Sequence, residues 1–239
     1  MASEPKKSAG DESRGGGRRR RARGSLTPEL ILDAAERIAA EQGYPAVTMR
    51  AVAAESGAAP MALYRHFPSK DELVNAMLDR VLGRFEPAPA TDDWTADLGS
   101  FALAHRRLLD QHPWALQALF THPSPGINAT RIGEVALTII DRGGFSDDHA
   151  VAIFSGLLAL NYGWVSFTAE RNAEVDVAAG LAEALAALPP AMFPRTLAVA
   201  PDMAAYGSDE HYEFVLGYTL AGIRVAAPGS RAASRGGTS

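Results

Sequence analysis

The sequence predicts an all-α protein with a small N-terminal helix-turn-helix domain and a larger C-terminal helical bundle. Apolar residues recur at the spacing of an amphipathic helix in most of the chain, and no segment shows the alternation typical of a strand. Proline and glycine separate the helices from one another. We expect a disordered basic arm at residues 1–24, a helix-turn-helix domain at residues 25–86, a helical bundle at residues 92–226 and a disordered tail at residues 227–239.

The composition is that of a globular protein and excludes several kinds of site. The chain has 239 residues, 47% hydrophobic and 21% charged, which is enough for a substantial core. It has no cysteine, so disulfides and thiolate metal sites are excluded. The sequence shows no apolar run of 18 residues and no apolar signal-peptide core, so we expect a soluble, cytoplasmic protein.

The N-terminal arm differs in charge from the rest of the chain. Residues 1–24 contain eight Lys and Arg against three Asp and Glu, a net charge of +5, so the remaining residues sum to −10 within the total of −5. Such a Gly-rich, basic segment cannot bury enough surface to fold alone. We expect Arg18, Arg19, Arg20 and Arg21 to contact the phosphates or the minor groove of DNA. The alternative is a solubilising tail.

The first helix is expected to begin at Pro28 and to end before Gly43. Thr27 is a suitable N-cap, Pro28 favours the first helical position, and Glu29 complements the helix dipole. The apolar face of this helix would support the two short helices that follow it.

Two short helices with a tight turn between them come next. Thr48 can cap the first helix, and Gly57 supplies the left-handed residue at its end. The second helix, over residues 59–67, would bury Leu63 and Phe67 and turn its other side chains outward. Such a pair is either an ordinary helical hairpin or a helix-turn-helix, whose second helix enters the major groove of DNA.

The remaining helices are predicted from N-capping residues and from the prolines and glycines that end helices. Ser69 and Glu72 form a capping box for a helix that runs to about Phe85, and prolines in residues 86–93 mark the domain boundary. In the larger domain, helices are expected at residues 94–111, 114–120, 128–141, 147–171 and 209–225. Residues 177–188 could be helical, and the proline-rich residues 189–208 are left unassigned.

The residues around the turn resemble the signature of the tetracycline-repressor (TetR) family of bacterial regulators. The resemblance is carried by LYRHFPSKDEL at residues 63–73 and by T-M-R-x-V-A at residues 48–53, and it covers Leu26 to about Phe85. The later helices resemble that family's inducer-binding domain, of the subtype found in the tetracycline repressors and many actinobacterial relatives. The resemblance implies a DNA-binding repressor that a small-molecule inducer releases.

The resemblance also implies roles at the DNA. Arg50 matches a family position that reaches a base edge. Four residues match positions that hold phosphates: Thr48, Tyr64, His66 and Lys70. Arg65 stands where relatives often carry an aromatic residue, so its contact with a base or a phosphate is open.

The segment that would enter the groove is apolar. Pro60, Met61 and Ala62 bring no hydrogen-bond donors and can offer only apolar contact, for instance to thymine methyl groups. We therefore hypothesise that the arginine arm supplies a larger share of the affinity than usual, while Arg50 and Arg65 carry most of the discrimination between bases.

The resemblance implies an inducer cavity inside the second domain. The candidate wall residues are Phe101, His105, Trp114, Leu119, Phe120, His122, Asn161 and Trp164. The alternative for each is a place in an ordinary core. A magnesium–tetracycline inducer is not expected, because Phe85-Glu86 stand where the tetracycline repressors have a metal-linked His and Phe101 stands where they have a drug-binding Asn. No metal and no cofactor are predicted.

An enzymatic function is not predicted. His105 with Asp110, or His149 with Asp147 and Asp148, could be drawn as an acid–base pair. Neither pair lies near a nucleophile elbow, a phosphate loop or a metal-binding spacing, and helix capping explains the acidic pair better.

The helices at residues 147–171 and 209–225 carry more apolar surface than one core needs. By resemblance they would pair with their counterparts in a second copy, where Gly156, Gly163 and Gly217 allow close approach; the alternative is that both are central core helices. The predicted function is a homodimeric repressor of a palindromic operator, controlling an efflux or biosynthetic gene as the family commonly does. The alternatives are an activator of the same fold and an architectural DNA binder that uses the arm without sequence preference.

Overall fold

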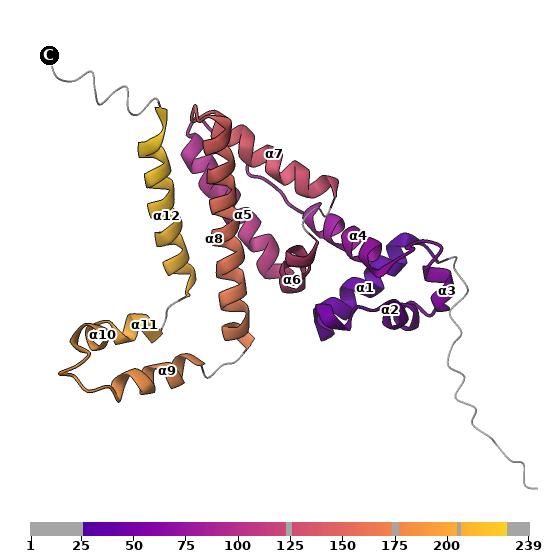
Figure 1. Ribbon diagram of the computed structural model, residues 1–239, viewed down its shortest axis with the longest axis horizontal. Coiled ribbons are helices and arrows are strands. Elements are labelled where there is room, and N and C mark those ends of the chain that lie inside the picture. Colours follow the sequence, from indigo (N-terminus) through magenta and orange to yellow (C-terminus); the bar gives the residue numbers. More distant parts are fainter. Residues whose placement is uncertain (1–25, 123–125, 174–176, 205–206, 229–239) are drawn as a thin grey trace, which may run out of the picture.

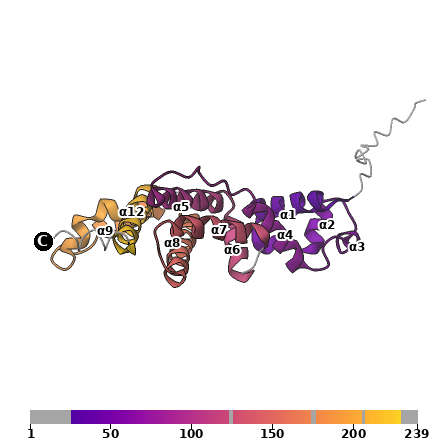
Figure 2. The same cartoon turned by 90° about the horizontal axis from the view of Figure 1, so that it is seen from above.

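The computed structural model describes residues 26–122, 126–173, 177–204 and 207–228, and in these it is all-α, as predicted. The helix-turn-helix lies at one end, α5 to α8 form the body, and the hairpin of α9 to α11 lies at the other end (Figures 1 and 2). The predicted basic arm and all but the first two residues of the predicted tail lie outside the described residues.

The first helix, α1, spans Pro28–Gln42 and has the predicted ends. The Thr27 hydroxyl accepts a hydrogen bond from the amide of Leu30, and Gly43 stops the helix with a φ of 83°. A short 3-10 turn, η1 at Tyr44–Ala46, leads on to the next helix. The cap at Thr27 and the stop at Gly43 both depend on residues close in the chain, which is why the sequence alone locates them.

The helix-turn-helix consists of α2 at Met49–Glu55 and α3 at Pro60–Leu63. Thr48 caps α2 by accepting from the amide of Ala51, and Gly57 turns the chain with a φ of 68°, as predicted. α3 is shorter than the predicted helix over residues 59–67. The chain continues past Leu63 in turns that still bury Phe67, so the two predicted inward residues are correct.

The helix α4, Lys70–Leu82, begins at the predicted cap, where Ser69 accepts from the amide of Glu72. It ends three residues before the predicted Phe85. The amides of Arg84 and Phe85 bond to carbonyls only three residues back, which tightens the chain into a turn.

The body is built around α5, Trp94–Gln111, which packs against α7, Ile127–Asp141, and α8, Asp147–Ala173. α6, Pro113–Thr121, lies between the body and α1. One continuous cluster of buried apolar side chains extends from Ile31 in α1 to Leu216 in α12. The two predicted domains therefore share a core.

The segment that the sequence left unassigned contains two short helices. α10 at Pro194–Ala198 and α11 at Ala200–Ala204 follow α9 at Val177–Ala186, and α9 packs against α11 (Figure 1). The last helix, α12 at Asp209–Ala226, is capped by Ser208 and packs against α5.

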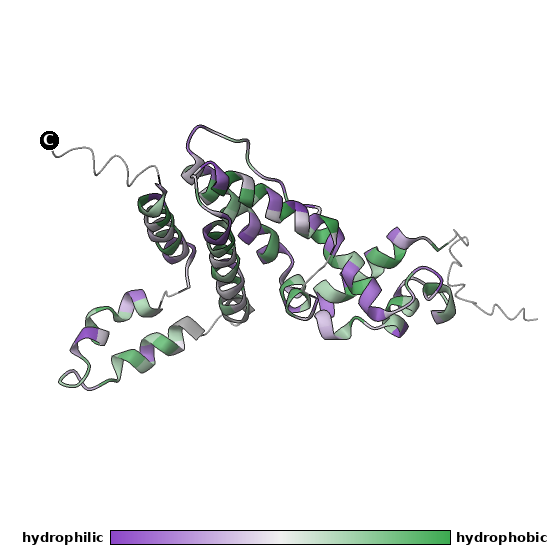
Figure 3. Ribbon diagram, turned by 45° about the horizontal axis from the view of Figure 1, so that its top comes forward, coloured by the Kyte–Doolittle hydropathy of each residue, from purple (hydrophilic) through white to green (hydrophobic). Residues whose placement is uncertain are grey.

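The helix α8 differs from the expectation that no long apolar stretch is present. Its segment Asp147–Ala169 is long and apolar enough to cross a membrane by length and composition, and only 17% of its most apolar window is buried in this chain. Figure 3 shows apolar residues along both α8 and α12. Serine, asparagine and threonine interrupt the run, so a search for unbroken apolar sequence misses it.

The segment between α4 and α5 is tied to the body at its far end. The Asp97 carboxylate accepts hydrogen bonds from the amide and hydroxyl of Thr91, and Arg142 donates to it at 2.6 Å. Hydrogen bonds from Thr91 and then from Arg142 hold the pKa of Asp97 below its usual value. Nearby, Arg224 of α12 forms an ion pair with Asp93.

Candidate DNA-binding face and ligand cavity

The helix-turn-helix presents an exposed polar face beside an apolar tip. Arg50, Arg65 and His66 are exposed, and no described residue accepts a hydrogen bond from their side chains. Met61 at the tip of α3 is 73% exposed, and Tyr64 is also exposed. Leu63 is buried behind this face and anchors it to the core.

The other predicted DNA contacts differ in their exposure to solvent. Pro60 is exposed and Ala62 is half-buried. The Thr48 oxygen is engaged as the α2 cap, which leaves its hydroxyl proton free to donate. Lys70 is half-buried, with its ammonium group 5.3 Å from the centroid of the Tyr44 ring. Arg18 to Arg21 lie outside the described residues.

Ion pairs fix α4 against α1. Arg80 pairs with Asp33 and with Glu36, the latter at 3.2 Å, and Arg84 pairs with Glu36 at 2.6 Å. The hydrogen bond to Asp33 raises the pKa of Arg80 above its ordinary value. These pairs connect α4 to α1 along their partly exposed sides.

A cavity of about 550 Å³ lies among α4, α5, α6, α7 and α8. Its size and mostly apolar lining are typical of small-molecule sites. Of the eight residues predicted to line an inducer cavity, His105 and Leu119 do so. Among the lining residues that were not predicted, α8 contributes Phe154, Leu158 and Tyr162. Their four-residue spacing along α8 is the signal that could have identified them.

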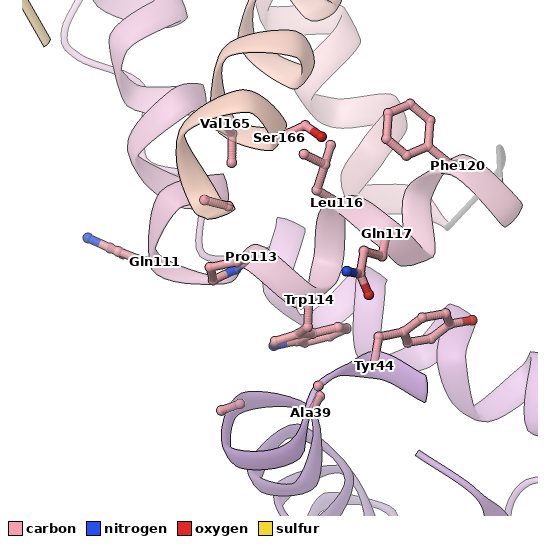
Figure 4. A pocket seen from close by; sticks show the side chains of 13 residues that line it. Ala39, Tyr44, Gln111, Pro113, Trp114, Leu116, Gln117, Phe120, Val165 and Ser166 are labelled. Atoms are coloured by element: carbon pink, nitrogen blue, oxygen red, sulfur yellow. The ribbon is translucent and has the colours of Figure 1, made fainter. Parts of the chain in front are cut away.

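The other six predicted ligand residues lie elsewhere. Trp114 and Phe120 line a separate cleft beside α1 (Figure 4). Phe101 stacks on the His105 ring behind the cavity, and Trp164 packs edge-on against Tyr212. The ring of His122 bonds to the Ala118 carbonyl, and Asn161 belongs to the buried network below. Contact with a ligand stays a prediction for all eight residues.

A buried polar network connects the cavity to α12. Asn161 donates to the carbonyl of Ala102 and to Nδ1 of His105, each at 3.0 Å, and it accepts from the Tyr212 hydroxyl. Burial lowers the pKa of His105 to about 4, so the ring is neutral at physiological pH. With Nδ1 as the acceptor, the ring proton is on Nε2, for which no described residue is an acceptor.

Two contacts connect the cavity to α4, the helix that follows the helix-turn-helix. Leu82 of α4 lines the cavity. One turn earlier, the Asp79 carboxylate accepts the backbone amide of Asn128 at 2.8 Å, and the Asn128 side chain donates to both the Asp79 carbonyl and its carboxylate. The start of α7 and the last turn of α4 are therefore held together.

The exposed helix-turn-helix and the cavity behind it define a class of protein, the one-component regulators that combine a DNA reader with a ligand pocket. Within the described residues, no group of three side chains is arranged to hold a metal ion. The family model described as "Bacterial regulatory proteins, tetR family" matches residues 31–77, and "Tetracyclin repressor-like, C-terminal domain" matches residues 86–227. The chain belongs to the TetR family.

Relatives and solved structures agree with this assignment. An HTH-type transcriptional regulator of Saccharopolyspora erythraea is 30% identical over 84% of this chain and 86% of its own length. The HTH-type transcriptional repressor DrrR1 of Streptomyces coeruleorubidus is 39% identical over 54% of this chain, and the match spans 48% of that protein. Apo ActR from Streptomyces coelicolor superposes with a TM-score of 0.76 and 25% identity, covering 86% of this chain and 98% of that one.

Proposed function

We propose that the protein is a ligand-responsive transcriptional repressor that binds a palindromic operator as a homodimer and is released by a small-molecule inducer. The observation that carries this proposal is the position of α4, which follows the DNA-binding face at Lys70 and lines the cavity at Leu82. A ligand that moves α4 therefore also moves the helix-turn-helix. An efflux or biosynthetic gene is the proposed target, and the cytoplasm is the proposed location.

The DNA contacts are proposed from exposure and chemistry together. Arg50 and Arg65 are exposed and can donate to base edges or phosphates, whereas Met61 offers an apolar contact to a thymine methyl group. Tyr64, His66, Thr48 and Lys70 would hold phosphates.

The exposed apolar surfaces of α8 and α12 support a homodimer. An apolar groove of about 470 Å³ runs between these helices, and Tyr218 on α12 is 77% exposed. At Gly156, Gly163 and Gly217 no described atom beyond the local helix backbone lies within 4 Å of where a side chain would begin, so a second copy can approach closely. A partner helix pair would bury this surface, and a dimer would present two readers to two half-sites.

The inducer is proposed to bind in the cavity of about 550 Å³. A structure of ActR is described as a complex with actinorhodin, and another as a complex with (S)-DNPA. In this chain, neutral His105 can donate its Nε2 proton to a ligand oxygen. Tenfold derepression requires the ligand to favour the released state by about 1.4 kcal/mol.

The test is binding of the purified protein to DNA flanking its own gene, with excess unrelated competitor DNA. Wild type and a control, Arg107→Ala on the exposed side of α5, should protect a palindrome. Arg50→Ala should weaken that binding by roughly tenfold to a hundredfold. Equal binding by all three proteins would contradict the proposed reader.

The same experiment separates the alternatives. Loss of wild-type binding under competitor would favour an architectural binder that acts through the arm. Transcription in vitro from the protected DNA distinguishes a repressor from an activator, since an activator would raise the yield of transcript. A catalytic function is not proposed.

A further inference from the structure

A second cleft, of about 380 Å³, lies where the helix-turn-helix domain meets the body. Tyr44 of η1 and the end of α1 form one wall, α6 contributes Trp114, Gln117 and Phe120, and α8 contributes Ser166. Figure 4 shows these side chains around the cleft. None of its described lining residues also lines the proposed inducer cavity, and on α6 Phe120 lines the cleft whereas Leu119 lines the cavity.

The chemistry of the walls indicates what the cleft would hold. None of the described residues that line it is charged. Three of them are aromatic, and Phe120 is 66% exposed although it is a large apolar side chain. Lys70 stacks over Tyr44 but does not line the cleft. A neutral, flat aromatic molecule matches these walls, whereas a charged one would lose its hydration without gaining a partner.

Polar groups at the cleft are available to orient such a molecule. Among the described residues, the indole N–H of Trp114, the amide of Gln117 and the hydroxyl of Ser166 have no hydrogen-bond partner. In Figure 4 the Gln117 amide is directed toward the rings of Trp114 and Tyr44. A few hydrogen-bonding groups around an apolar surface are the usual composition of a small-molecule site.

We propose that this cleft is a second ligand site, which takes a neutral aromatic molecule with a hydroxyl or carbonyl substituent. Its walls come from the reader on one side and from the body on the other. A bound molecule therefore favours the arrangement that keeps these walls at their present separation. The proposal concerns binding alone and does not depend on repression or on the identity of the inducer.

The test uses 2-naphthol as the probe and the indole N–H signals of ¹⁵N-labelled protein as the readout. The chain has three tryptophans, and Trp114→Phe assigns the signal at the cleft. Trp94 packs against Phe145 away from the cleft and serves as an internal reference. 2-Naphthol should shift the Trp114 signal and leave the Trp94 signal in place. An unmoved Trp114 signal would overturn the proposal.

Variants distinguish the two cavities. Ala169→Phe fills the cleft from an exposed position on α8, and Gly133→Leu fills the inducer cavity, where a side chain would begin 3.6 Å from Phe154. Ala184→Phe on the exposed side of α9 is the control. The Trp114 shift should survive in Gly133→Leu and in the control and disappear in Ala169→Phe. Loss of the shift in Gly133→Leu together with its survival in Ala169→Phe would overturn the proposal.

Two further measurements test the ligand class. Naphthalene-2-sulfonate, which has the same rings but a charge, should bind at least about tenfold more weakly than 2-naphthol. Gln117→Leu keeps the approximate size of the side chain but removes the amide. This variant should bind 2-naphthol about fivefold more weakly. Equal affinity for the charged and neutral probes would contradict a neutral ligand, and an unchanged affinity in Gln117→Leu would contradict orientation by that amide.

Discussion

Gly126 lies so close to Asp79 that any side chain at residue 126 would overlap the Asp79 carboxylate. The glycine has a φ of 118°, which L side chains rarely adopt. Gly126 lies two residues before Asn128, whose backbone amide donates a hydrogen bond to the same carboxylate. A single glycine thus allows α7 to begin against α4, at the edge of the proposed ligand cavity.

Gly126→Ala is expected to lower the free energy of unfolding by about 1–3 kcal/mol, because it combines a strained backbone with displacement of the Asp79 carboxylate. Chemical denaturation measures this change. The control is Gly180→Ala in α9, where no described atom beyond the local helix backbone lies within 4 Å of the added carbon and φ is not positive. It should leave the stability unchanged or raise it by about 0.5–1 kcal/mol. Equal effects of both substitutions would contradict the role of Gly126.

Deletion of residues 1–23 tests the basic arm. If the arm neutralises phosphates, the deletion should reduce the dependence of DNA affinity on salt, by close to one unit of slope for each lost contact. Binding to one operator is measured from low to physiological salt. A truncated protein with an unchanged slope would show that the arm is a solubilising tail.

His105 should make the stability of the protein depend on pH between about 6.5 and 4. Its pKa is about 4 in the folded chain and near its ordinary value of 6.5 when unfolded, so the unfolded state binds the proton more tightly. Stability is therefore greatest above pH 6.5 and falls as the pH drops toward 4, by roughly 3 kcal/mol at most.

The comparison for His105 is His105→Gln, which cannot titrate but keeps an amide oxygen that can accept from Asn161. The difference in unfolding free energy between wild type and this variant should narrow as the pH is lowered through that interval. Parallel pH profiles would show that His105 is not the group that titrates.

Tyr218→Glu should convert the proposed dimer to a monomer, because it places a charge on the exposed apolar surface of α12. Light scattering gives the mass, and operator binding should be lost with the dimer. Met61→Glu is the matched control, since Met61 is similarly exposed but lies on the proposed DNA-binding face. That variant should lose DNA binding and keep its mass. A dimeric Tyr218→Glu protein would contradict the proposed interface.

The sequence located the helix ends that depend on local chemistry. Thr27, Thr48 and Ser69 cap their helices as predicted, because the acceptor and the donor are three residues apart in the chain. The prediction extended the C-terminal ends of α3 and α4 too far along the chain. Apolar spacing continues through a turn as well as through a helix, so Phe67 and Phe85 are buried without being helical.

The ligand cavity was harder to predict than the fold. In α8 the apolar stripe through Leu157 packs in the core, and a second stripe through Leu158 faces the cavity. Both stripes have helical spacing, so periodicity alone cannot separate them. Trp114 and Leu119 likewise share one short helix but reach different cavities. Only the three-dimensional arrangement decides between them.

The shared core sets a rule for building chimeric regulators from this chain. Phe85, at the end of the DNA-binding half, packs edge-on against Phe101 of α5, with 5.4 Å between the ring centroids. If the helix-turn-helix domain is exchanged for that of another regulator at the proline-rich junction, Phe85 is replaced while Phe101 stays. A functional hybrid therefore has to bring in a residue that fills the Phe85 position, or retain the native sequence from the middle of α4 onward.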